Sequence, residues 1–534
     1  MGVDANLQGG DFGNALQVAS MSGYGNIVQL LLERGADVNA QGGHFRNALQ
    51  AAASNGHHEI VLLLLDKGAD VNAQGGHFGN ALQGALTQGY DVIFQLLLDK
   101  GADVNAQDTR YGNALQTALS RGDDRIIRLL LDKGADINAK GGDGDALQAA
   151  STYGLDEAVQ LLLEKGANVN AQGGTHGNAL QIASSKGHEK IVRLLLEKGA
   201  DVNTQGGMYG NALQAAASNS HDDIVRLLLE RGADVNALGE NYGTALQTIS
   251  VRGHDKMVRM LLENGADVNA LGGYYGSALQ GASVWGHGET ARLLLETGAN
   301  ANAQGGSFGN ALQGASSYGH LEIVQMLVEN KADVNTQGGF YGNALQAAAL
   351  QGNKQIVCLL LEKGADIHAQ GGRFGNALQA ASSNGHDEIV QLLLSKGVDV
   401  NASGGYHGNA LQAASVQGHD STVRLLLENG ADVHTEGGSF GYALQAASSY
   451  NHAGIVRLLL EKGADVNAQG GHFGTALQAA ATSEHDRVVH MLLEMGADVN
   501  IQGGYYGTAL EAASSQRAHR IVRLLLEHGA DGGL

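Results

Sequence analysis

Short apolar segments alternate with polar, glycine-rich segments along the whole chain, and the pattern repeats at a fixed interval. An Ala-Leu-Gln triplet, with Glu in place of Gln in the last copy, recurs with its leucine at Leu16, Leu49, Leu82 and onward to Leu510. The step is 33 residues, with a single step of 32 residues before Leu147. A unit of this length holds two short helices and a turn, and it buries its apolar side only by stacking on neighbouring units. The period therefore predicts a stack of 16 units.

The unit around Asn376 shows how each element is encoded. Asn376 precedes the apolar segment 377–381, and Asn is a preferred helix N-cap because its side chain accepts a free backbone N–H of the first turn. A second helix is expected through residues 389–394, whose broad apolar surface suits contacts with its partner helix and both neighbouring units. Gly397 ends that helix, because a left-handed residue is best accommodated without a Cβ. The polar segment 399–405 then predicts a projecting turn, and we call each such turn a finger.

Two units depart from this design. The cap position holds Asn, Thr, Ser or Asp in 15 units and Tyr442 in the other, so we expect a weak helix start at Tyr442. Glycine follows the second helix in 15 units, and Lys331 takes its place once. Helices this short are marginal alone, because nucleation is costly. The stack is therefore expected to be the folding unit.

Composition favours one continuous array. Self-similarity from Gly9 to Leu526 leaves no place for a linker, so we expect a single repeat domain over residues 1–534, with a partial unit at its N-terminal end. Cys358 is the only cysteine, which excludes a disulfide within the chain. No segment resembles a signal peptide, and the longest aliphatic run, residues 60–65, is far shorter than the ~20 residues that span a bilayer. We expect an intracellular, cytoplasmic protein without membrane contact, and a nuclear location is compatible with the sequence.

The acidic character comes mainly from repeated positions. The formal charge is −21, from 33 Lys and Arg against 54 Asp and Glu. Two positions of the repeat, the Gly-Ala-Asp step and the end of the second helix, supply 29 of these acids. A solvated outer surface explains this pattern, and nucleic acid is disfavoured as a partner because phosphate neutralisation needs clustered Lys and Arg.

The repeated motif Gly-Asn-Ala-Leu-Gln-Ala-Ala, followed by Gly-His, Ile-Val, Leu-Leu-Leu and Gly-Ala-Asp-Val-Asn-Ala, resembles the ankyrin repeat over essentially the whole chain. The resemblance implies an all-α solenoid of helix-turn-helix units with projecting turns or β-hairpin fingers, curved into a superhelix. Residues 14–17 read Asn-Ala-Leu-Gln where the family usually has Thr-Pro-Leu-His. Phe45, Phe78 and Tyr275 stand where the family commonly has glycine, and a Gly-Gly pair lies upstream. This variant resembles the C-terminal ankyrin arrays of filamentous-fungal NOD-like receptors, but no Gly-x-x-x-x-Gly-Lys-Ser/Thr loop occurs.

Catalytic and metal chemistry are not expected. Ten units carry a histidine at the turn between their two helices. Packed helices lie ~8 to 10 Å apart, too far for successive imidazoles to share a metal ion, so hydrogen bonds within the turns are the expected role. No Ser, His and Asp set has a distinctive catalytic signature. We therefore expect no enzyme activity, no cofactor and no metal. The resemblance also implies that turn asparagines such as Asn39 and Asn72 are candidates for hydroxylation.

Variable positions are the best guide to a binding site, because scaffold positions repeat by necessity. Two positions vary most: the finger tip, and the end of the first helix. Both are expected to face the inner groove of an ankyrin-like stack, and aromatic residues and Arg are the types that anchor interfaces. Neutral drift of exposed residues is the alternative. The predicted protein-binding residues are Tyr153, Met208, Tyr274, Tyr275, Trp285, Tyr318, Phe340, Arg373, Tyr406 and Tyr450.

These observations predict a monomeric, non-catalytic scaffold that binds a protein partner through its concave groove and finger tips. Two alternatives stay open, the recognition part of a fungal immune-type receptor and a free-standing adaptor or transcriptional coregulator. The first expected helix, over residues 15–21, lacks a polar outer face, whereas the last unit carries Glu511, Arg517 and Arg520. Because solenoids need polar caps, we expect a neighbouring segment upstream.

Overall fold

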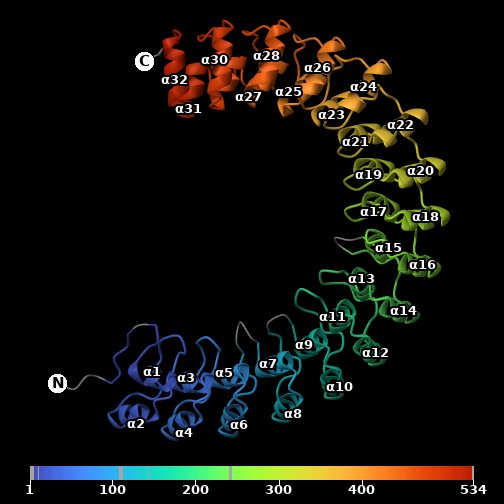
Figure 1. Ribbon diagram of the computed structural model, residues 1–534. Coiled ribbons are helices and arrows are strands. Elements are labelled where there is room, and N and C mark those ends of the chain that lie inside the picture. The colour runs from blue at the N-terminus through green and yellow to red at the C-terminus, as the bar shows by residue number, and fades with distance from the viewer. Residues whose placement is uncertain (1–4, 10, 108–111, 142–143, 240–242, 532–534) are drawn as a thin grey trace. The chain divides into compact units, whose positions relative to one another are not determined.

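The protein is a stack of short helix pairs. The computed structural model describes residues 5–9, 11–107, 112–141, 144–239 and 243–531. These residues form 32 α-helices joined by turns and single β-bridges (Figure 1). The predicted all-α repeat solenoid is confirmed.

The first helix of each pair starts at the Ala-Leu-Gln or Ala-Leu-Glu triplet. These odd-numbered helices are α1 (Ala15–Met21), α3 (Ala48–Ser54), α5 (Ala81–Gln88), α7 (Ala114–Arg121), α9 (Ala146–Tyr153), α11 (Ala179–Lys186), α13 (Ala212–Ser218), α15 (Ala245–Ser250), α17 (Ala278–Trp285), α19 (Ala311–Tyr318), α21 (Ala344–Leu350), α23 (Ala377–Ser383), α25 (Ala410–Gln417), α27 (Ala443–Ser449), α29 (Ala476–Thr482) and α31 (Ala509–Ser515).

The second helix of each pair carries the leucine-rich segment. These even-numbered helices are α2 (Gly25–Glu33), α4 (His58–Asp66), α6 (Asp91–Asp99), α8 (Asp124–Asp132), α10 (Asp156–Glu164), α12 (Glu189–Glu197), α14 (Asp222–Glu230), α16 (Asp255–Glu263), α18 (Gly288–Glu296), α20 (Leu321–Glu329), α22 (Lys354–Glu362), α24 (Asp387–Ser395), α26 (Asp420–Glu428), α28 (Ala453–Glu461), α30 (Asp486–Glu494) and α32 (His519–Glu527).

Helix starts and ends follow the predicted capping chemistry. The Asn376 side chain accepts the backbone N–H of Gln379, and the Gln379 side chain accepts the N–H of Asn376, which completes a capping box. Tyr442 makes no side-chain cap bond, as predicted. Gly397 closes α24 in the left-handed region at φ +85°, and Lys331 takes the same conformation at φ +64° although it has a Cβ.

Polar side chains join each unit to the next. Besides capping its own helix, Gln379 donates from Nε2 to the carbonyls of Ala402 and Gly408 in the following finger, at 2.8 and 3.0 Å. Asn335 accepts the N–H of Asp366 at 2.7 Å and donates to the Gly364 carbonyl at 3.0 Å. Both patterns recur along the array and satisfy backbone groups of the turns and fingers, which have no partner within a helix. They also fix the register of neighbouring units.

The fingers are tight hairpins closed by glycines. In the finger before α23, Gly371 forms an antiparallel bridge with Gly375, and its N–H donates to the Gly375 carbonyl at 2.8 Å. Gly372 lies at φ +60°, and a Cβ there would fall 2.5 Å from the backbone of Tyr341 in the preceding finger. The Gly-Gly pair therefore lets successive fingers pack backbone to backbone.

The helix pairs divide into two compact units, residues 1–240 (unit 1) and 241–534 (unit 2). In each unit the odd-numbered helices form one row and the even-numbered helices form a second row, and in unit 2 the odd row lies on the inner side of the bend (Figure 1). The single domain over residues 1–534 stays a prediction. In the part of the chain that the structure describes, every helix is too short to cross a membrane.

Candidate protein-interaction surface

Most of the predicted binding residues are exposed. Trp285 is 55% exposed and Tyr274 60%, and Tyr275 is half-buried. Tyr153 and Met208 belong to unit 1, and the other eight predicted residues belong to unit 2. The exposed residues of the set are Tyr153, Met208, Tyr274, Trp285, Tyr318, Phe340, Arg373, Tyr406 and Tyr450.

The finger tips of unit 2 are connected through their backbones. The Tyr406 N–H donates to the Arg373 carbonyl at 2.8 Å, and the Arg373 N–H donates to the Phe340 carbonyl at 3.4 Å. Because these bonds hold successive tips side by side, their side chains stack. The guanidinium carbon of Arg373 lies 5.8 Å from the centroid of the Phe340 ring and 5.3 Å from that of the Tyr406 ring. Three of the predicted residues thus form one stacked group.

A second group forms beside α17 and α19, from the fingers that precede these helices and from their C-terminal ends. The rings of Tyr275 and Phe308 are parallel, with centroids 6.3 Å apart, and Phe308 meets Tyr318 edge-on at 5.9 Å. Tyr274 contacts Tyr275 edge-on at 5.0 Å. The indole Nε1–H of Trp285 donates to the Tyr275 hydroxyl at 2.9 Å. The structure therefore brings together all four residues predicted between 274 and 318.

The two groups lie on adjacent fingers, because a Cβ added to Gly339 would fall 2.6 Å from the backbone of Phe308. Tyr341 belongs to the first group. It meets Phe340 edge-on at 5.1 Å, while Phe340 meets Phe374 at 6.0 Å. Burial raises the pKa of the Tyr341 hydroxyl above its ordinary value, and the neighbouring Tyr318 raises it further. We call the combined surface the aromatic band, which comprises Tyr274, Tyr275, Trp285, Phe308, Tyr318, Phe340, Tyr341, Arg373, Phe374 and Tyr406.

Sequence reasoning missed Phe308, Tyr341 and Phe374. These residues occupy the second finger position, which is aromatic or histidine in most units and from which only Tyr275 was predicted. The regular aromatic at this position was the available signal. Tyr450 belongs to a separate pair of the same kind, because it meets the buried Phe440 edge-on at 5.7 Å.

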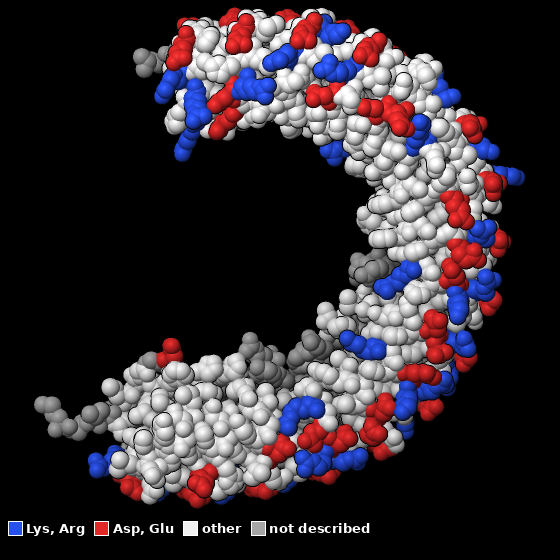
Figure 2. Space-filling model, in the orientation of Figure 1, with Lys and Arg blue, Asp and Glu red and all other residues white. Residues whose placement is uncertain are grey.

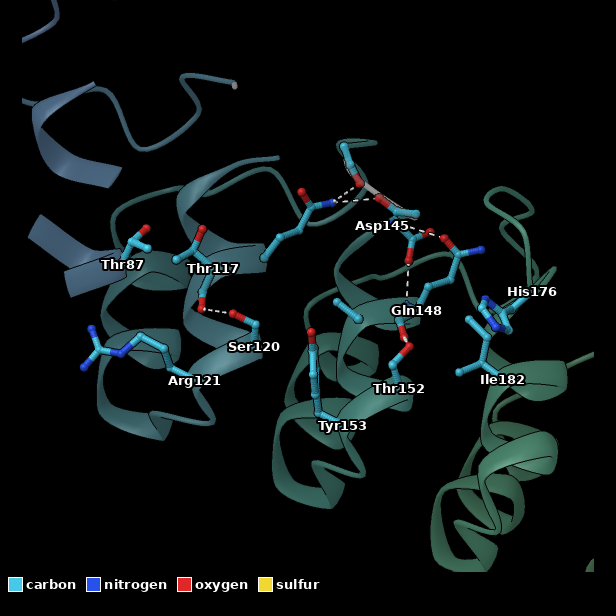
Figure 3. A pocket seen from close by; sticks show the side chains of 14 residues that line it. Thr87, Thr117, Ser120, Arg121, Asp145, Gln148, Thr152, Tyr153, His176 and Ile182 are labelled. Carbon is cyan, nitrogen blue, oxygen red and sulfur yellow. Dashed lines mark hydrogen bonds between the residues drawn. The ribbon is translucent and has the colours of Figure 1, made fainter. Parts of the chain in front are cut away.

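Tyr153 lines a cavity of about 370 Å³ in unit 1, beside the finger that is one residue shorter than the others (Figure 3). Part of that finger, residues 142–143, lies outside the described residues. The lining comes from α5, α7, α9, α11 and the turns before them, and comprises Thr87, Gln116, Thr117, Ser120, Arg121, Gly141, Gly144, Asp145, Gln148, Ala149, Thr152, Tyr153, His176 and Ile182.

Most polar groups of this cavity are committed to local structure. The Ser120 hydroxyl donates to the Thr117 carbonyl, and the Arg121 guanidinium donates to the Leu86 carbonyl and contacts Asp91. The Asp145 carboxylate accepts the backbone N–H of Gln148 as a helix cap (Figure 3). Burial raises the pKa of Asp145. These are structural roles, and the missing finger residue accounts for the space.

The turn histidines form hydrogen bonds, as expected, but these bonds join neighbouring units and do not lie within one turn. Nε2 of His57 lies 2.9 Å from the Met21 carbonyl, and Nε2 of His320 lies 3.1 Å from the Val284 carbonyl, in each case in the preceding unit. The same contact recurs at other copies, including His221, which is 3.1 Å from Ser185. Within the described ranges, no group of three or more His, Cys, Asp or Glu side chains could hold a metal ion.

Charge is distributed unevenly in unit 2. Acidic and basic side chains gather over the even-numbered helices, whereas the side of α17, α19 and α21 that bears the aromatic band is almost free of them (Figure 2). An uncharged, aromatic inner side beside a charged outer side has the composition of the core of a protein–protein interface.

Comparison with known families agrees with this geometry. The family model described as ankyrin repeats (3 copies) matches residues 1–75, 81–173, 140–206, 172–238, 237–305, 279–371, 345–437 and 444–534. The chain belongs to the ankyrin-repeat family. No curated protein matches the sequence. Ankyrin repeats generally mediate protein–protein interaction. In this ankyrin array, Gln replaces the usual histidine of the first helix and still bonds both its own cap and the next finger, as Gln379 shows.

Proposed function

We propose that this ankyrin-repeat protein is a non-catalytic scaffold that binds a protein partner on the aromatic band of unit 2. The observation that carries the proposal is the density of exposed aromatic side chains on one side of successive units. Tyr274, Trp285, Tyr318, Phe340 and Tyr406 are each about half exposed or more. Contiguous exposed apolar surface of this kind is uncommon on monomeric soluble proteins and marks interaction sites.

The band is also pre-organised for binding. Within each of its two groups the rings contact one another, and the Trp285 indole is held by the Tyr275 hydroxyl. Side chains already held by their neighbours lose less conformational freedom when a partner binds, so more of the contact energy appears as affinity. Interface anchors are enriched in Trp, Tyr and Arg, and the band contains all three types. Neutral drift would give exposed aromatics without requiring this mutual contact.

The test is capture from a lysate of the source cells with the full chain as bait. The test variant replaces Trp285 and Tyr318 with Ala. The control replaces Tyr24 and Met495, which are 58% and 52% exposed and lie outside the band. A protein captured by the wild type and the control, but lost with the test variant, supports the proposal. Equal capture by all three baits would remove the aromatic band as the binding surface.

The wider biological role is a separate proposal, which builds on the proposed binding function. The Gly-Gly-x-aromatic-Gly fingers support the recognition part of a fungal immune-type receptor, because they resemble the arrays of fungal NOD-like receptors. A phosphate-binding loop encoded directly upstream would support this role, and its absence would favour a free-standing adaptor or transcriptional coregulator. We also propose a cytoplasmic location and a monomeric state, which a fluorescent fusion and sedimentation velocity would test.

A further inference from the structure

The inner side of unit 2 carries a single formal charge over five consecutive fingers and first helices, and that charge is Arg373. No other Lys, Arg, Asp or Glu occurs in these five segments, which are residues 270–285, 303–318, 336–351, 369–384 and 402–417. The corresponding segments on either side carry Arg252 and Glu436. In a chain of net charge −21, a lone cation in the middle of an uncharged aromatic surface is a distinct chemical feature.

Arg373 is positioned but not neutralised. Its guanidinium carbon lies over both the Phe340 ring and the Tyr406 ring, 5.8 and 5.3 Å from their centroids. Among the described residues it forms no ion pair with a carboxylate. A ring attracts the cation without accepting all of its five N–H donors, so donors are left for a ligand.

The charge of Arg373 affects the pKa of the neighbouring His407. Burial lowers the pKa of His407, and the positive charge of Arg373 lowers it further, so the imidazole is neutral at pH 7. The site therefore presents one positive charge within apolar surroundings. A bound partner would displace water from around Arg373. A charge-assisted hydrogen bond to the guanidinium would then be stronger, because the local dielectric constant is lower.

We infer that the partner of the aromatic band is an extended peptide segment that presents an Asp or Glu carboxylate to Arg373, flanked by apolar or aromatic side chains that cover the band. This inference rests on the proposed function and specifies its ligand. A carboxylate matches the edge of one guanidinium through two parallel hydrogen bonds. A nucleic acid would need several cations along its phosphates, and the five segments that bear the aromatic band supply one.

The experiment uses the full chain and a synthetic peptide library. Each peptide has about ten residues, with mixed apolar and aromatic flanks and a central Glu, Gln, Lys or phosphoserine. Peptides selected on the immobilised protein are titrated, with Trp285 fluorescence as the readout, because it is the only tryptophan and lies in the band. The variants are Arg373→Gln and Arg373→Lys. The control is Arg424→Gln, at an exposed arginine on α26, and circular dichroism checks that each variant is folded.

The expected result is that Glu-centred peptides bind the wild type about tenfold more tightly than their Gln-centred matches. This preference should vanish in Arg373→Gln, weaken in Arg373→Lys and persist in the control. Selection of peptides without an acid preference, or with a preference for phosphoserine that survives in Arg373→Gln, would overturn the inference and leave the proposed function standing. Selection of no peptide at all would count against both.

Discussion

The indole N–H of Trp285 donates to the hydroxyl of Tyr275 at 2.9 Å, and this bond ties the end of α17 to the finger that precedes it. The Tyr275 ring is in turn parallel to the Phe308 ring of the next finger. A side chain that is more than half exposed is thus held in one orientation by a chain of contacts across two units. An anchor residue held in this way loses little conformational entropy when a partner binds.

Removing that bond should loosen the indole without unfolding the array. In Tyr275→Phe the ring stack remains, but the Trp285 N–H loses its partner, so the indole should sample more rotamers. Time-resolved fluorescence anisotropy reports only Trp285 and should show a larger fast component. Tyr505→Phe, at a finger tip far along the chain, is the matched control. An unchanged anisotropy decay in Tyr275→Phe would show that the hydrogen bond does not fix the indole.

Lys331 should be a point of stored strain. It lies at φ +64°, where 15 other units have glycine, and a residue with a Cβ costs ~1 kcal/mol or more in that conformation. Lys331→Gly should therefore raise the free energy of unfolding by about 1 kcal/mol, measured by urea denaturation. The reverse change, Gly364→Lys at φ +87°, should lower it by a similar amount. A lower free energy of unfolding in Lys331→Gly would mean that the lysine side chain stabilises the fold by more than the backbone strain destabilises it.

Tyr442 should be a weak helix start. Its side chain makes no cap bond to α27, whereas Asn409 caps α25 through the N–H of Gln412. Tyr442→Asn should restore that bond and slow hydrogen exchange at the first turn of α27, with a gain of ~1 kcal/mol. Asn409→Ala should have the opposite effect on α25. Unchanged exchange at α27 would indicate that the tyrosine ring stabilises the turn as well as a cap does.

Asp145 should make unit 1 less stable as the pH rises. Burial raises the pKa of Asp145 in the folded state above 3.8. Between pH 3.8 and this raised pKa the folded protein binds more protons than the unfolded chain, so its stability falls as the pH rises through this range. Asn is the commonest residue at this cap and carries no charge. Asp145→Asn should therefore stabilise the protein at neutral pH, and the gain should shrink as the pH falls toward 3.8. A gain that is independent of pH would argue against the buried charge as its cause.

The Gln of the first helix should be needed for unit-to-unit bonding. Gln379 is 3% exposed and bonds its own cap and two carbonyls of the next finger. Gln379→Leu would leave these buried groups unpaired, at ~1 to 3 kcal/mol, whereas Gln379→His, the usual residue of the family, should retain part of the bonding. Hydrogen exchange in the following finger should be faster in the Leu variant than in the His variant. Equal exchange rates in the Leu and His variants would show that apolar packing alone sets the register of neighbouring repeats.

The helices could be predicted from the sequence because each is encoded locally. Asn376 and Gly397 mark one helix start and one helix end by the chemistry of a single side chain, and the two exceptions, Tyr442 and Lys331, take the same places in the fold. Contacts inside the aromatic band could not be predicted, because they depend on how closely successive fingers approach. The fingers approach closely because a Gly-Gly pair in one finger packs on the backbone of the preceding finger, as Gly372 packs on Tyr341. This distance depends on two repeats together and is not encoded in either one alone.

The most direct test of the account is hydrogen exchange of the full chain with and without a captured protein partner. Binding on the aromatic band predicts protection at the fingers around residues 272–276, 305–309, 338–342 and 371–375 and at the C-terminal ends of α17 and α19, with little change in the even-numbered helices. Protection confined to the even-numbered helices, with the fingers unchanged, would contradict it.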